Sequence, residues 1–174
     1  LLNLFESITW IGFNRPDQIE NSSYLEVTTN EIELVALQNV GGKTIGAKAS
    51  ILMQYPKMWK LIHSEIKKHS FIHCRAPSNP AFIAMQLSKK YESKQFWFKY
   101  AGSWVDDTSY FYNLQRNRLK NLGANSKVTV NGNWENQASN ILAFENPCLT
   151  EKERELGKRL QIQNYVLQRL IFVL

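Results

Sequence analysis

The fold of this chain is decided by the stretch Phe71-Ile72-His73-Cys74-Arg75-Ala76-Pro77-Ser78-Asn79, a short apolar strand that ends in a polar loop, and by two later stretches of the same kind. These are Phe96-Trp97-Phe98 followed by Lys99-Tyr100-Ala101-Gly102-Ser103-Trp104, and Val128-Thr129-Val130 followed by Asn131-Gly132-Asn133-Trp134. In open α/β sheets, ligands bind beyond the carboxyl ends of the strands. The three loops are therefore expected to line one edge of a common site.

Helices are expected between these strands. Ser78-Asn79 resembles a helix start with Pro80 in the first turn, and a second amphipathic segment runs over residues 109–122 and ends at Gly123. Helical crossovers between successive strands make the strands parallel. The sequence therefore predicts an α/β fold, a Rossmann-like three-layer domain with a mostly parallel sheet.

The amino-terminal part extends this sheet. Residues 7–13 read as a strand, and residues 31–37 alternate polar and apolar side chains, which favours a strand near the sheet edge. A helix is expected from Pro56, because Met58, Trp59, Ile62 and Ile66 recur at helical spacing and proline suits a first turn.

Composition limits the classes of function. The 174 residues are 44% hydrophobic, which indicates a packed domain. The formal charge of +6 would suit an acidic partner, and the alternative is that most basic residues lie on ordinary solvated helix faces. Zinc-ligand spacing, an aromatic RNA-reading strand pair and a helix-turn-helix are all missing, so nucleic acid is not the expected partner.

With no signal peptide and no run of roughly 20 apolar residues, we expect a cytoplasmic protein. A second expected location is the inner face of the membrane, because the helix expected at residues 109–122 mixes aromatic and basic side chains and could lie on an anionic surface. Packing of that helix on the sheet is the alternative.

Common catalytic motifs are missing. Gly42-Lys43-Thr44 lacks the first glycine of a phosphate-binding loop, and neither G-x-G-x-x-G nor G-x-S-x-G occurs. Cys74 and Cys148 have no metal-binding spacing and read as reduced thiols. The three histidines form no metal set, so no metal is predicted. His73 remains open between a functional group and a satisfied core histidine.

The order of these motifs, closed by Asn146-Pro147-Cys148-Leu149-Thr150 and by Arg169-Leu170-Ile171-Phe172-Val173, resembles the amino-terminal domain of glycosyltransferase family 4, from about Pro56 onward. Members of that family have the GT-B fold, so this chain would be the amino-terminal half of a GT-B fold. The last segment is similar to the strand that opens the family's carboxy-terminal domain. On this basis residues 1–148 form the acceptor-side domain, residues 149–164 a connector, and residues 165–174 the first strand of a truncated second domain.

The resemblance implies an activity. Such enzymes transfer a sugar, with retention and without a metal ion or cofactor, from a nucleotide-diphosphate sugar to a glycan or lipid-linked acceptor. The carboxy-terminal domain that holds the donor is absent from this sequence, so the catalytic residues are unknown and the chain alone should be inactive. Partners would be the nucleotide sugar, the acceptor, the missing domain and, in some members, the membrane surface.

The strand-end loops supply the candidate acceptor-binding residues. Arg75 and Lys99 favour an anionic ligand, while Tyr100 and Trp104 offer flat faces on which sugar rings can pack. Asn79 and Asn131 can bond sugar hydroxyls, and Gly102 lets backbone approach closely. Each residue also has a structural explanation: Arg75 as a helix cap, Trp104 and Trp134 as packing lids, Asn131-Gly132 as a turn. The alternative function is a non-catalytic α/β domain that binds an anionic glycan or nucleic acid.

Overall fold

The structure is a computed structural model that describes residues 5–14, 30–38, 45–106, 109–135, 137–144, 152 and 170–173. Within these residues the elements follow in the order β1 (Ile8–Phe13), β2 (Ile32–Leu37), α1 (Ile45–Lys68), β3 (Phe71–Ala76), α2 (Asn79–Ser88), β4 (Gln95–Tyr100), α3 (Tyr110–Lys120), β5 (Ser126–Asn131), β6 (Ile141–Phe144) and β7 (Leu170–Val173).

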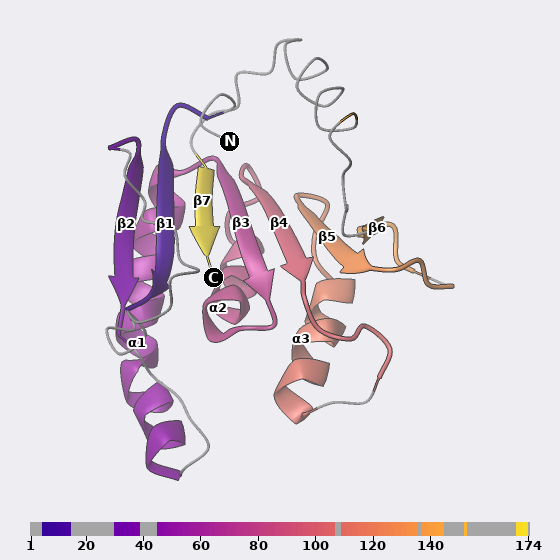
Figure 1. Cartoon of the computed structure of the whole chain (residues 1–174), viewed down its shortest axis with the longest axis horizontal. Helices are drawn as coiled ribbons and strands as arrows, with labels where there is room; N and C mark the ends of the chain where they lie inside the picture. Colours follow the sequence, from indigo (N-terminus) through magenta and orange to yellow (C-terminus); the bar gives the residue numbers. More distant parts are fainter. Residues whose placement is uncertain are drawn as a thin grey trace.

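The strands form one sheet in the order β2-β1-β7-β3-β4-β5-β6 (Figure 1). Every pairing between neighbouring described strands is parallel. This confirms the predicted α/β class and the mostly parallel, Rossmann-like sheet. It also confirms that β2, predicted near an edge, is an edge strand.

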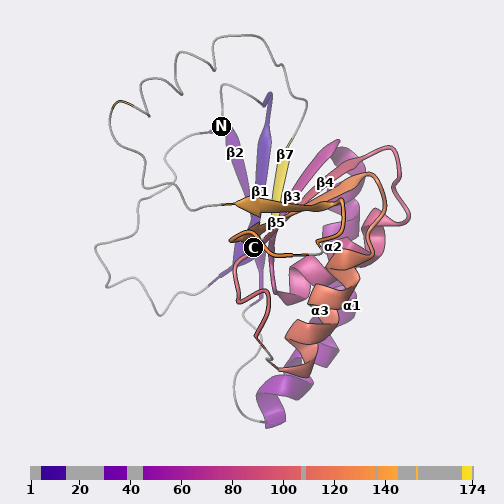
Figure 2. The same ribbon diagram turned by 90° about the vertical axis from the view of Figure 1, so that its right-hand side faces the viewer.

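One face of the sheet carries the main core. The three helices of the described residues lie on this face (Figure 2), and α2 packs between α1 and α3. Because side chains alternate along a strand, every second residue points at the helices. The helix-facing set includes Ile11, Ile72, Cys74, Phe96, Phe98, Tyr100, Val128 and Val130, which pack with Met58, Ile62, Ile66, Ile83 and Leu119. We refer to the other side, which carries no helix of the described residues, as the open face.

The predicted start of α2 agrees with the structure, whereas the predicted start of α1 does not. At α2 the prediction is confirmed, because the Ser78 hydroxyl accepts a hydrogen bond from the Ala81 amide and Pro80 lies in the first turn. At α1 the expected start was wrong: the helix begins at Ile45, and Pro56 lies inside it. Residues 45–54 include alanine, leucine, methionine and glutamine, which favour a helix. The carbonyl that Pro56 leaves unbonded belongs to Leu52, which is exposed to water.

The position of β7 corrects the division into domains made from the sequence. Leu170–Val173 was expected to open a second domain, but it pairs with β1 on one side and β3 on the other, in the middle of the single sheet. A short apolar strand gains most burial and two hydrogen-bonded neighbours in that central place. The connector expected at residues 149–164 lies outside the described residues, apart from residue 152.

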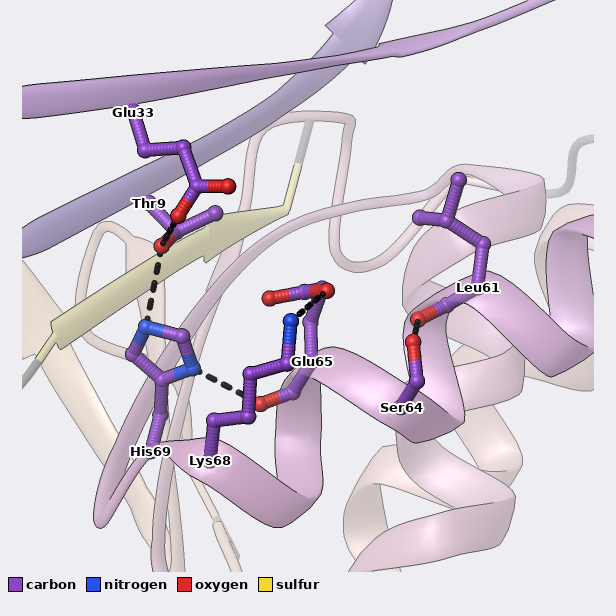
Figure 3. Close-up of polar contacts among 7 residues, drawn as sticks. All are labelled: Thr9, Glu33, Leu61, Ser64, Glu65, Lys68 and His69. Carbon is purple, nitrogen blue, oxygen red and sulfur yellow. Dashed lines mark hydrogen bonds and ion pairs between the residues drawn. The ribbon is translucent and has the colours of Figure 1, made fainter.

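A polar network fastens the end of α1 to the sheet (Figure 3). His69 Nδ1 lies 2.7 Å from the Glu65 carbonyl oxygen, and His69 Nε2 lies 3.0 Å from the Thr9 hydroxyl. Thr9 in turn donates to the Glu33 carboxylate at 3.4 Å. Since a carbonyl can only accept, Nδ1 carries a proton, and three elements are joined through one buried imidazole.

Candidate functional site

Two of the predicted site residues lie directly opposite each other. Arg75 and Lys99 were expected in loops, but β3 and β4 run two residues further than predicted and include them. They are register partners on neighbouring strands, on the open face near the carboxyl ends. Neighbouring strands lie about 4.8 Å apart, so both basic side chains start from the same part of this face.

Asn131 closes the same edge on the next strand. It is the last residue of β5, is exposed, and pairs with Phe144 of β6. The Phe144 ring lies 4.4 Å from Lys99 Nζ, which holds the ammonium group over the open face through a cation–π contact. Arg75, Lys99 and Asn131 therefore form one group, which we call the basic edge.

Tyr100 does not belong to the basic edge. Because it follows Lys99 within β4, its side chain points to the opposite face, where it is fully buried beneath the helices. Burial raises the pKa of its hydroxyl, and the nearby Arg116 charge opposes that shift. A ring in this position cannot serve as the stacking surface expected from the sequence.

Trp104 and Gly102 accompany Tyr100 on the helix side. Trp104 is 7% exposed and meets Tyr100 edge to face, with ring centroids 5.1 Å apart. A Cβ at Gly102 would lie 3.2 Å from the Tyr100 ring, so the glycine allows the loop after β4 to cross that ring. Trp104 is thus a packing residue, the structural alternative weighed above, and Gly102 supports the same packing.

Asn79 follows the carboxyl end of β3 and is not part of a strand. It is the first residue of α2 and is partly buried. The loop before it turns through a cis peptide bond between Ala76 and Pro77. The Ser78 amide in this loop donates to Gln115 Oε1 of α3 at 3.1 Å. These contacts place Asn79 beyond the carboxyl end of β3.

His73 lies on the open face, two residues before Arg75. Its ring meets Trp97 edge to face at 4.4 Å, and the Trp97 indole N–H donates to the Thr129 hydroxyl at 2.9 Å. Burial, assisted by the Lys99 charge, lowers the pKa of His73 to about 4. At neutral pH the imidazole is therefore uncharged, within reach of the Lys99 charge.

We expect His73 to make the protein less stable in acid. The unfolded imidazole has a pKa of about 6.5, so between pH 6.5 and 4 the unfolded state binds more protons than the folded state. Its contribution is complete above about pH 6.5 and is lost as the pH falls, with a limit of about 3 kcal/mol. Urea unfolding of the wild type and of His73→Gln at pH 7 and at about pH 4.5 measures this loss. An equal loss in both proteins would contradict the assignment.

Sequence reasoning missed one pocket. It has a volume of about 510 Å³ and lies between α3 and the crossover from β5 to β6. Its walls include Trp104, Trp134, Asn117 and Gln137. The sequence offered one signal for this pocket, which is Trp134. It lies four residues after the predicted strand end at Val130, just as Gly102 lies four residues after Phe98.

Two classes of site find no support in the described part of the chain. No three side chains of His, Cys, Asp or Glu are grouped there so as to hold a metal ion. None of its helices has the length and apolar character needed to cross a membrane. No protein-family model, curated protein or solved structure matches the chain.

Proposed function

We propose that this chain is the acceptor-side domain of a retaining glycosyltransferase that uses a nucleotide-diphosphate sugar and transfers the sugar to a glycan or lipid-linked acceptor. The observation that carries the proposal is the basic edge, where Arg75 and Lys99 are register partners near the carboxyl ends of parallel strands. The motifs from Ile72 to Thr150 resemble those of glycosyltransferase family 4 and suggest the class of reaction. Leu170–Val173 adds nothing to this resemblance, because it is a strand of the same sheet.

The topology supports a ligand at this edge. Dinucleotide-binding doubly wound sheets have the strand order 3-2-1-4-5-6 and bind at the point where the order reverses. Here β7 is flanked by β1 and β2 on one side and by β3, β4, β5 and β6 on the other. The order of the strands therefore reverses between β1 and β3, where β7 is inserted, and Arg75 is on β3.

The charges favour a phosphate or another anion as the group held there. Like charges on opposed strand positions repel, which costs stability unless something compensates for them. An anion between the two cations removes the repulsion and gains charge-assisted hydrogen bonds, bidentate ones from the Arg75 guanidinium. A phosphate of the donor or of a lipid-linked acceptor has this chemistry.

The direct test is an assay of sugar transfer. The product of the complete gene and the 174-residue chain are each incubated with a panel of nucleotide-diphosphate sugars and lipid-linked acceptors. We expect nucleotide release and sugar transfer from the complete product only. If neither protein turns over or binds any donor, glycosyltransferase activity is rejected in favour of a non-catalytic domain that binds an anionic glycan.

His73 gives a second readout that needs no turnover. Lys99 contributes to the lowered pKa of His73. Pyrophosphate bound at the basic edge would cancel part of that effect, so the pKa of His73 should rise in an NMR titration. In Lys99→Met the pKa of His73 should already be higher and should respond less to pyrophosphate. No change in the wild type would argue against anion binding at this edge.

A further inference from the structure

The pocket between α3 and the β5–β6 crossover is separate from the basic edge. Its wall includes Ile141, which is paired with Val128 and so belongs to the helix side of the sheet. The basic edge lies on the open face. We propose that this pocket binds a pyranose unit of a glycan, with the sugar ring on the indole of Trp134 and its hydroxyls bonded to amide side chains of the pocket.

Trp134 is held as a fixed aromatic surface. Its indole N–H donates to the Asn131 carbonyl at 3.0 Å, and 39% of the residue stays exposed. Gly132 has a φ of 85°, and a Cβ there would lie 3.3 Å from the Trp134 ring. Only glycine adopts this conformation readily and leaves room for the ring. One side of the indole is therefore supported by backbone, and the exposed part is available to the apolar face of a sugar.

Amide groups surround this surface. Asn113, Asn117 and Gln137 all line the pocket. A carboxamide both donates and accepts hydrogen bonds, which matches the hydroxyl groups of a sugar. Among the described residues, the Gln137 Nε2 atom is buried and has no hydrogen-bond partner. A buried donor without an acceptor is unfavourable, and a sugar hydroxyl bound in the pocket would supply the acceptor.

The charges of the pocket favour a neutral ligand. Arg116 has its guanidinium occupied by the carbonyls of Ser103 and Trp104 and by the Asn113 side chain. Lys120 and Glu135, of opposite sign, complete the charged lining. Lys120 Nζ lies 5.7 Å from the Trp104 ring centroid and covers that indole. Trp104 is thus a wall of the pocket, and Trp134 is the surface for stacking.

The volume suits this assignment. Ligand pockets in proteins measure roughly 300–1,000 Å³, and about 510 Å³ accommodates one or two sugar rings. The inference goes beyond the proposed function, because saccharide binding here does not require sugar transfer. In a glycosyltransferase, such a pocket would hold part of the acceptor glycan away from the reacting group.

The test is direct binding to the 174-residue chain. Maltose, cellobiose, chitobiose and lactose are titrated by calorimetry up to about 10 mM, the range in which single-ring stacking gives measurable affinity. We expect at least one disaccharide to bind. Trp134→Ala should then weaken binding by about tenfold or more, which corresponds to about 1.4 kcal/mol, and Trp134→Phe should keep part of the affinity.

The control is Tyr110→Ala, which removes an aromatic ring that is 83% exposed at the start of α3, outside the pocket. This variant should bind as the wild type does. The proposal is overturned if no disaccharide binds, if Trp134→Ala leaves the affinity unchanged, or if uridine monophosphate binds in a Trp134-dependent way while the sugars do not. Loss of donor turnover in the complete gene product would not bear on these results, so the two proposals can fail separately.

Discussion

Replacing Arg75 with alanine in the complete gene product is expected to lower kcat/KM for sugar transfer by about 10- to 100-fold. A hydrogen bond to a charged group contributes about 1.5–3 kcal/mol, and each 1.4 kcal/mol is tenfold in rate or affinity. Arg75→Lys should recover part of the loss, because it restores the charge without the planar fork. Steady-state kinetics at saturating acceptor and varied donor, and the reverse, separate effects on the two substrates.

The same substitution is expected not to lower the stability of the protein, although it lowers the activity. In the protein without ligand, Arg75 faces Lys99 across paired strands. Arg75→Ala should therefore leave the free energy of unfolding unchanged or raise it by a few tenths of a kcal/mol. Lys127→Ala is the matched control, since Lys127 is exposed on β5 and lies opposite Trp97, nearer the amino ends of the strands. It should change kcat/KM less than twofold by electrostatic screening alone. If kcat/KM fell equally in both variants, Arg75 would act only through the overall positive charge of the protein and not through a contact with the substrate.

Replacing Arg116 with alanine is expected to lower the free energy of unfolding by about 2–4 kcal/mol, because buried acceptors would lose a charged donor. Arg116 is 8% exposed and donates to the Ser103 carbonyl at 3.2 Å, to the Trp104 carbonyl at 2.7 Å and to the Asn113 side chain. These bonds fasten the loop after β4 onto α3. Urea unfolding measures the loss, and limited proteolysis should show faster cleavage within residues 101–106.

Arg118→Ala on the same helix is the control. Arg118 is exposed and its guanidinium lies 4.5 Å from the Phe82 ring centroid. A cation–π contact at an exposed site contributes about 0.5–1 kcal/mol, so this variant should lose much less stability. Similar losses for the two arginines would mean that the carbonyl contacts of Arg116 contribute little.

The sequence allowed the class of fold to be predicted because its apolar strands alternate with helical crossovers. The strands at Phe71, Phe96 and Val128 and the start of α2 at Ser78 are where the pattern indicated them. Each depends on local signals: β-branched and aromatic runs, a capping hydroxyl and a proline in the first turn. The meeting of Arg75 and Lys99 followed from parallel pairing alone.

The predictions that were wrong required knowledge of where strands end and of which distant segments pair. Periodicity does not show where a strand stops, and a shift of one residue moves a side chain to the other face. Tyr100 was therefore grouped with Lys99, although it points into the core. The central place of β7 could not be read from Leu170–Val173 itself, because an apolar strand fits the middle of any sheet. The pocket with Trp134 needs three segments brought together in space.

The central place of β7 also bears on the order of folding. Leu170–Val173 is the last described strand along the chain, yet it joins β1 to β3. During synthesis at the ribosome, the sheet cannot be completed until residue 173 has emerged. Before then, the β1–β2 pair and the β3–β6 group are separate, and each has an unpaired edge where β7 will bind. Pairing at such sequence separation is slow, and the waiting edges are open to strands from other chains. Exposure of these edges, and with it the tendency to pair with other chains, is therefore greatest in the interval before β7 enters the sheet.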